Sequence, residues 1–134
     1  MGGVKFWDNH VIMQAVLVIC LGACAGALLR WQLELAVRAG LIPLPAWCDP
    51  NLIANLLGCL VIGVLVAHPQ HPRLFLWGGV GFCGSLTTFS SWMLQVVLTL
   101  RGGQPGAALV MLLLPLAGGL VCTAVAARLA ARWR

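Results

Sequence analysis

The feature that most constrains this chain is the length of its predominantly apolar segments. There are four of them, at Val11–Leu29, Leu52–Ala67, Leu74–Leu100 and Ala107–Ala127. A helix needs about 20 apolar residues to cross a hydrocarbon core about 30 Å thick. With only 8% charged residues and a mean hydropathy of +0.99, the chain lacks the polar surface of a soluble domain. We therefore expect an all-α membrane protein, a single domain over residues 1–134 with four transmembrane helices near 11–37, 50–67, 73–100 and 104–128.

Basic and aromatic residues flank the expected spans. The side of the two termini carries Lys5, Arg73, Arg128, Arg132 and Arg134, and the opposite side carries Arg38, Arg101 and, if it reaches that surface, Arg30. An excess of basic residues marks cytoplasmic loops, so this count favours both termini inside. Because both sides carry basic residues, insertion in both orientations stays open. Tryptophans near the span ends would form an aromatic belt: Trp7, Trp31, Trp47, Trp77 and Trp133.

Three local signals concern helix starts and packing. Asp49-Pro50 predicts a helix start, with the carboxylate as N-cap and proline at the first helical position. Gly22 and Gly26 form a small-xxx-small pair, which serves either packing within the subunit or a dimer contact. Most of the six cysteines lie in apolar runs and read as packing residues; a thiol pair or metal site at Cys20 and Cys24 is the weaker alternative.

The stretch "GFCGSLTTFSSW", Gly81–Trp92, places five hydroxyl side chains near the middle of the third apolar run. Irregular backbone survives at that depth only inside protein or along a cavity, since unsatisfied polar groups are costly in hydrocarbon. Gly84 lowers helix propensity, and the hydroxyls can bond carbonyls that a break frees. We expect a discontinuous third helix with its break at Gly84–Thr87. The alternative is a continuous helix that the hydroxyls merely kink.

Several other polar and aromatic residues lie at membrane depth, and most of them have two possible interpretations. Asn55 either makes a hydrogen bond between helices or lines a pore. Phe89 and Trp92 share a helix face, where they either pack in the core or turn their positive ring edges toward a small anion. Arg30 and Glu34, four residues apart, are expected to pair with each other.

The stretch Gly81–Trp92 resembles the signature of the Fluc (CrcB) family of bacterial fluoride channels, close to G-F-x-G-G-L-T-T-F-S-T-F. "GALLRW" at Gly26–Trp31 and "NLIANLLG" at Asn51–Gly58 are further similarities. The resemblance implies an antiparallel, dual-topology homodimer in the bacterial inner membrane, a multi-pass protein that passively exports cytoplasmic fluoride. It also implies a central structural sodium ion (Na⁺), held by backbone carbonyls that correspond here to Gly84 and Thr87.

The same resemblance assigns roles to individual residues. The fluoride pore would be lined by Asn55, Thr88, Phe89, Ser91 and Trp92, and the vestibule by Arg30 and Gln95. Several positions depart from the family pattern. Trp92 replaces a phenylalanine, Ser85 the second glycine and Gln95 a common glutamate, while Pro115 and Gly119 replace serines of the fourth helix.

Three other functions are alternatives. A small multidrug-type, proton-coupled cation exporter needs a membrane-embedded carboxylate, for which Glu34 is the only candidate. A non-transporting assembly subunit would leave the mid-membrane break without a purpose. An enzyme is not expected, since the three acidic residues and three histidines cannot form a catalytic cluster at one depth.

Overall fold

The computed structural model describes residues 9–45 and 48–132, and within them the chain consists of helices and their connections, without strands. The helices are α1 (Asn9–Arg38), α2 (Pro50–Val66), α3 (Pro72–Leu74), the π-helical segment η1 (Phe75–Cys83), α4 (Gly84–Leu86), α5 (Ser90–Arg101) and α6 (Pro105–Ala131). The all-α prediction is confirmed. The flank and belt assignments of Lys5, Trp7, Trp47, Trp133 and Arg134, and the acidic residue Asp8, lie outside the described residues.

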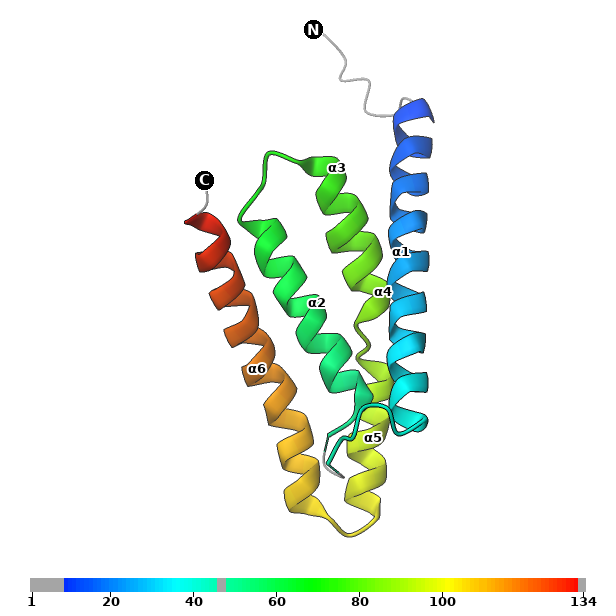
Figure 1. Cartoon of the computed structure of the whole chain (residues 1–134), viewed down its shortest axis with the longest axis vertical. Coiled ribbons are helices and arrows are strands. Elements are labelled where there is room, and N and C mark those ends of the chain that lie inside the picture. The colour runs from blue at the N-terminus through cyan, green and yellow to red at the C-terminus, as the bar shows by residue number, and fades with distance from the viewer. Residues whose placement is uncertain (1–8, 46–47, 133–134) are drawn as a thin grey trace, which may run out of the picture.

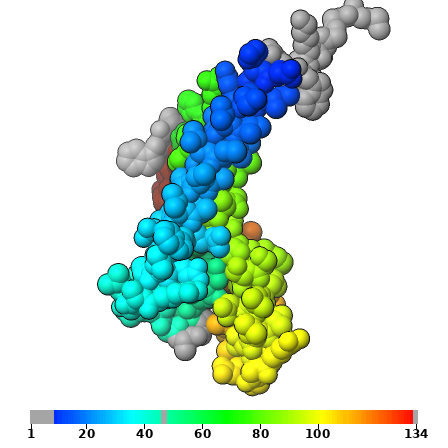
Figure 2. Space-filling model, turned by 90° about the vertical axis from the view of Figure 1, so that its right-hand side faces the viewer, coloured from blue at the N-terminus to red at the C-terminus, as the bar shows by residue number. Residues whose placement is uncertain are grey.

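The helices stand side by side as antiparallel rods, with α3, η1, α4 and α5 following one another along the third rod (Figure 1). α1 packs against η1 and α4, α2 packs against α6 and η1, and α5 packs against α6. Figure 2 shows α1 lying along the first half of the third rod, while α5 extends beyond it. The start of α1 and the end of α6 lie at the same end of the bundle (Figure 1).

The outward faces of the helices are apolar. Helices α1 and α6 are long and apolar enough to cross a membrane, and α2 is a shorter apolar helix. Large apolar side chains such as Leu21 and Leu120 are 66% and 75% exposed in the isolated chain. Exposed apolar surface on this scale is stable in lipid or against another protein, not in water. The membrane character is therefore supported, while four spans within one domain stay a prediction.

Helix α2 begins as its local sequence predicts. Asp49 has extended backbone angles, and its carboxylate accepts a hydrogen bond from the amide of Asn51. Pro50 occupies the first helical turn, where its missing amide hydrogen costs nothing. The predicted N-cap is confirmed.

The glycine pair of α1 packs inside the subunit. A Cβ atom on Gly22 would collide with the carbonyl oxygen of Trp77, and one on Gly26 with that of Phe82. Both carbonyls belong to η1, so the two helices approach each other at backbone distance. The internal-packing reading of Gly22 and Gly26 is confirmed, and a dimer contact through these two positions is wrong.

The third rod differs from its prediction in the position of the break. Gly84 has helical angles (φ −61°, ψ −31°) and opens α4, and the helix does not end until Leu86. Residues 87–89 are non-helical, and Thr87 is extended with φ −78° and ψ 151°. The predicted discontinuity is present, but the prediction that it begins at Gly84 is wrong. Glycine lowers helix propensity without forbidding a helix, and a tertiary contact a few residues further on decides where the helix stops.

Candidate functional site

The break in the third rod is held by one side chain from α2. Asn55 Oδ1 accepts a hydrogen bond of 2.9 Å from the amide of Thr88, and Asn55 Nδ2 donates one of 3.2 Å to the Thr88 carbonyl. The amide side chain thus satisfies both backbone groups of one residue, as a neighbouring strand would. One hydrogen on Nδ2 is left over by this pairing. The interhelical reading of Asn55 is confirmed, and pore lining stays a prediction for that second hydrogen.

Hydroxyl groups on either side of the break bond nearby carbonyls. Thr87 Oγ1 donates to the carbonyl of Cys83 at 2.8 Å, where the Thr87 amide also donates at 3.0 Å. Ser85 Oγ donates to the carbonyl of Ala23 on α1 at 2.8 Å. Thr88 Oγ1 accepts a 3.4 Å bond from the amide of Ser91 in the first turn of α5. The hydroxyl cluster therefore closes α4, tethers it to α1 and caps α5.

These hydrogen bonds take the regular helical donors away from the carbonyls of Gly84 and Thr87. In a continuous helix the amide of residue i+4 donates to carbonyl i, so Thr88 would serve Gly84 and Ser91 would serve Thr87. Here the Thr88 amide donates to Asn55 and the Ser91 amide to Thr88 Oγ1. Gly84 is exposed, and a Cβ atom placed on it would meet nothing within 4 Å. The two carbonyls that the resemblance assigns to a cation have thus lost their regular helical donors, and Gly84 borders open space.

The two aromatic residues after the break differ sharply in exposure. Phe89 is 70% exposed, whereas Trp92 is 6% exposed. Their ring centroids lie 5.6 Å apart with an interplanar angle of 85°, an edge-to-face pair. The indole Nε1 of Trp92 donates a 2.6 Å hydrogen bond to the carbonyl of Met111 on α6. Phe89 therefore presents a ring to the outside of the isolated chain, and Trp92 is fixed behind it.

A polar cavity of about 290 Å³ opens beyond the break, between the end of α1 and the start of α2. It is lined by Arg30, Glu34, Arg38, Cys48, Asp49, Pro50, Asn51, Gln95 and Met111. Among the described residues, Arg30 Nε and Asp49 Oδ2 are the buried side-chain atoms that have no hydrogen-bond partner. Burial, and then the Asp49 carboxylate, raise the pKa of the Cys48 thiol, so it adds no charge here. The predicted vestibule residues Arg30 and Gln95 do lie together.

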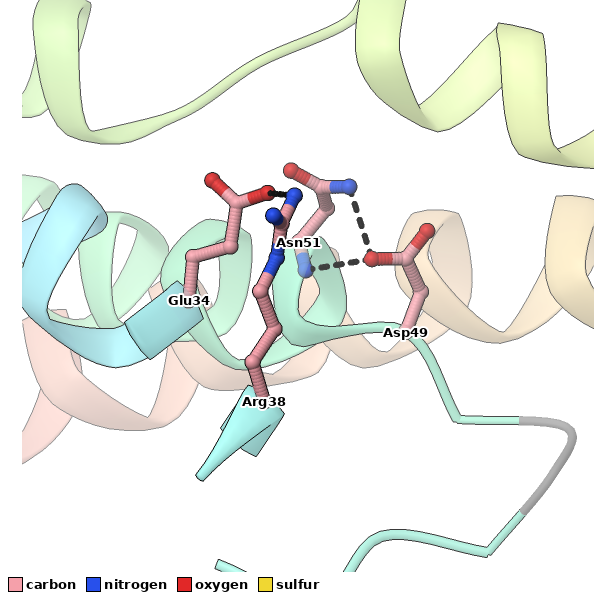
Figure 3. A network of polar contacts seen from close by, with 4 residues as sticks. All are labelled: Glu34, Arg38, Asp49 and Asn51. Carbon is pink, nitrogen blue, oxygen red and sulfur yellow. Dashed lines mark hydrogen bonds and ion pairs between the residues drawn. The ribbon is translucent and has the colours of Figure 1, made fainter. Parts of the chain in front are cut away.

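The expected pairing of Arg30 with Glu34 is wrong. Glu34 Oε1 instead accepts a 2.6 Å contact from Arg38 Nη2 (Figure 3). A carboxylate placed four residues before a cation is the better order on a helix, which favours Arg38 over Arg30 as its partner. Figure 3 also shows Asn51 turned toward Asp49, whose Oδ1 accepts from both the backbone and the side-chain nitrogen of Asn51. The Arg30 side chain is left with hydrogen-bonding capacity inside the cavity.

The cysteine hypothesis finds no support in the described residues. Cys20 and Cys24 are free and exposed, and the described part of the chain holds no group of three metal-ligating side chains of the His, Cys, Asp or Glu type. Both are compatible with lipid-facing or packing positions.

The fold and this site define a class: an all-α membrane protein whose third rod is interrupted and lined with redirected backbone groups. Such interruptions are typical of proteins that move ions. A family model described as CrcB-like protein, Camphor Resistance (CrcB), matches residues 17–127. The chain belongs to this family.

Named relatives agree with that assignment. Fluoride-specific ion channel FluC 2 of Parasynechococcus marenigrum is 44% identical over 119 residues, covering 89% of this chain and 83% of the relative. Fluoride-specific ion channel FluC of Neisseria meningitidis is 38% identical over 112 residues, covering 84% and 91%. For FluC 2 of a Synechococcus species, 44% identity over 92 residues covers 69% of this chain and 61% of the relative. The relatives are ion channels, so the family is not one of enzymes, as the sequence predicts.

Two features of the site were missed at the sequence level. The sequence predicts a possible bond from Asn55 to another helix but not its partner: the clamp between Asn55 and Thr88 joins residues 33 positions apart, and no local pattern indicates it. The bond from Trp92 to Met111 has a sequence signal, because Pro115 lies four residues after Met111 and cannot donate to its carbonyl.

Proposed function

We propose that this chain is the subunit of a fluoride-selective channel that passively lets fluoride leave the cytoplasm across the bacterial inner membrane. The observation that carries the proposal is the break at residues 87–89, where Asn55 holds the backbone open beside the Phe89 and Trp92 rings. The names of the relatives, which are fluoride-specific ion channels, support the choice of ion.

The anion route would begin at the polar cavity. Arg30 offers an unpartnered guanidinium nitrogen there, and Gln95 lines the same space without adding a negative charge. Beyond it, the spare Asn55 hydrogen, the hydroxyls of Thr88 and Ser91 and the ring edges of Phe89 and Trp92 would replace water around fluoride. Neutral donors and positive ring edges suit an anion, because they stabilise it without binding it as tightly as a full charge would.

A second copy of the chain would complete the pore. Phe89 is 70% exposed in the isolated chain, and Gly84 borders open space. Both lie at the depth of the break, where lipid contact with irregular backbone is costly. We propose an antiparallel, dual-topology homodimer that buries this surface.

A structural sodium ion would lie where the two breaks meet. The carbonyls of Gly84 and Thr87 lack the amide donors that a continuous helix would give them. Carbonyl oxygens freed in this way are the ligands that broken membrane helices offer to small cations. A fixed cation would also offset the cost of moving an anion through a low-dielectric bundle.

The proposal is tested by ion release from proteoliposomes that contain the purified protein. We expect fluoride, measured with an electrode, to leave far faster than chloride under matched gradients, with protein-free liposomes as the control. Equal release of both ions would refute the selectivity, and pH-gradient-driven uptake of a cationic drug would favour an exporter. No structural observation favours the exporter, because Glu34, its only candidate carboxylate, is paired with Arg38.

A further inference from the structure

Helix α6 runs without interruption from Pro105 to Ala131 although Pro115 lies inside it. Proline has no amide hydrogen, so residue 115 cannot make the i→i−4 bond to the carbonyl of Met111. Membrane helices tolerate proline when a neighbouring group satisfies the freed carbonyl. In this chain the indole Nε1 of Trp92 donates a 2.6 Å hydrogen bond to that same carbonyl.

The surroundings leave little room for another partner. Trp92, Met111 and Pro115 line a cavity of about 10 Å³, which is at the lower limit for a single water molecule. Trp92 is 6% exposed, and an indole buried to this degree needs an acceptor for its N–H group. The indole N–H of Trp92 needs an acceptor and the Met111 carbonyl lacks its helical donor, so the two groups satisfy each other.

We infer that Pro115 is a positioning residue for Trp92: it frees the Met111 carbonyl that anchors the indole. The anchored ring stands edge-to-face with Phe89, at 5.6 Å between centroids and 85° between planes. Pro115 thereby sets the orientation of the aromatic pair from a different helix. The effect on permeation rests on the proposed function, whereas the bond itself does not.

A double-mutant cycle of unfolding in detergent tests the bond. Trp92→Phe in the natural background leaves the Met111 carbonyl without a donor, which should lower the folded-to-unfolded ratio about five-fold, the usual value of one hydrogen bond, beyond the loss from the smaller ring. In a Pro115→Ala background the amide of residue 115 serves that carbonyl, so only the loss from the smaller ring should remain and the same change should cost about five-fold less. Equal losses in the two backgrounds would overturn the inference.

The smaller phenylalanine ring also alters packing, so a second substitution isolates the N–H group. The benzothienyl analogue of tryptophan keeps the shape of the indole and lacks its hydrogen. Placed at position 92, it should reproduce the loss of about five-fold in the natural background and not in the Pro115→Ala background. Trp31→Phe is the matched control for Trp92→Phe, because Trp31 is 54% exposed and lies on α1. An equal loss for the analogue in both backgrounds contradicts the pairing even if Trp92→Phe fails to fold.

Fluoride release by the same variants separates positioning from stability. The rate of fluoride release per folded protein is measured with the analogue and with tryptophan at position 92. The ratio of these two rates should differ by more than about two-fold between the natural and the Pro115→Ala backgrounds. An identical ratio would overturn the positioning role. If the unfolding cycle shows coupling between Trp92 and Pro115 but the protein releases no fluoride at all, the proposed function is refuted and the bond is still established.

Discussion

The third rod and α6 both contain backbone groups that lack their regular helical hydrogen bonds, but only the third rod is interrupted. In the third rod the helix stops, and residues 87–89 form an irregular segment. In α6 the helix continues through Pro115. The break needs a partner for both the amide and the carbonyl of Thr88, which Asn55 supplies, whereas the proline frees a single carbonyl, which Trp92 takes.

The two rods differ in the number of backbone groups that are freed and in the side chain that bonds to them. An asparagine amide can replace a whole peptide group, since it offers a donor and an acceptor in one plane. An indole offers one donor and can repair one carbonyl. The open segment of the third rod is therefore a tertiary feature, which depends on α2, and its removal should cost more than any change in the local hydroxyl groups.

The largest expected effect is that of Asn55→Ala. The substitution leaves the amide and the carbonyl of Thr88 without their partner, at about 1–3 kcal/mol for each group. We expect a loss of about 2–6 kcal/mol in the free energy of unfolding in detergent, and slower fluoride release per folded protein.

Asn51→Ala provides the comparison within the same helix. Asn51 donates its side-chain hydrogen bond to Asp49 at the start of α2, away from the break. A loss for Asn55→Ala no larger than that for Asn51→Ala would mean that another contact holds the break open.

The next largest effect is steric and concerns Gly58. A Cβ atom on Gly58 would collide with the Cγ2 methyl of Thr87, the first residue of the break. Gly58→Ala should therefore cost about 1–3 kcal/mol of stability, as overpacking usually does. The double variant Gly58→Ala with Thr87→Ser removes that methyl and keeps the hydroxyl, so it should recover most of the loss. Absence of recovery would show that the clash lies elsewhere.

The sequence predicts local features of this molecule well and long-range ones poorly. The cap at Asp49 depends on neighbours within two residues, and the sequence predicts it correctly. The existence of a break follows from clustered hydroxyls in an apolar run. Its position does not, because the clamp on Thr88 comes from α2. The partner of Glu34 can be predicted from the sequence, because a carboxylate four residues before a cation is the favourable order on a helix, and this order selects Arg38.

A smaller effect is expected for Thr87→Val. The hydroxyl of Thr87 donates to the Cys83 carbonyl at 2.8 Å, but the Thr87 amide donates there as well. The carbonyl keeps one partner, so we expect a loss of about 1 kcal/mol. Thr87→Ser, which retains the hydroxyl, is the control in the same unfolding assay. A loss for Thr87→Val as large as that for Asn55→Ala would contradict the dominance of the clamp.

The smallest effect is expected for Ser85→Ala. Ser85 Oγ donates to the carbonyl of Ala23 across the contact between α4 and α1. Ala23 lies inside α1, where its carbonyl also has a helical donor, so the substitution leaves no backbone group unsatisfied. Hydrogen bonds between membrane helices average about 0.6 kcal/mol, and a loss of that size should appear in detergent unfolding without a change in fluoride release per folded protein. A loss above about 2 kcal/mol would mean that the tether to α1, rather than the clamp from α2, keeps the third rod open.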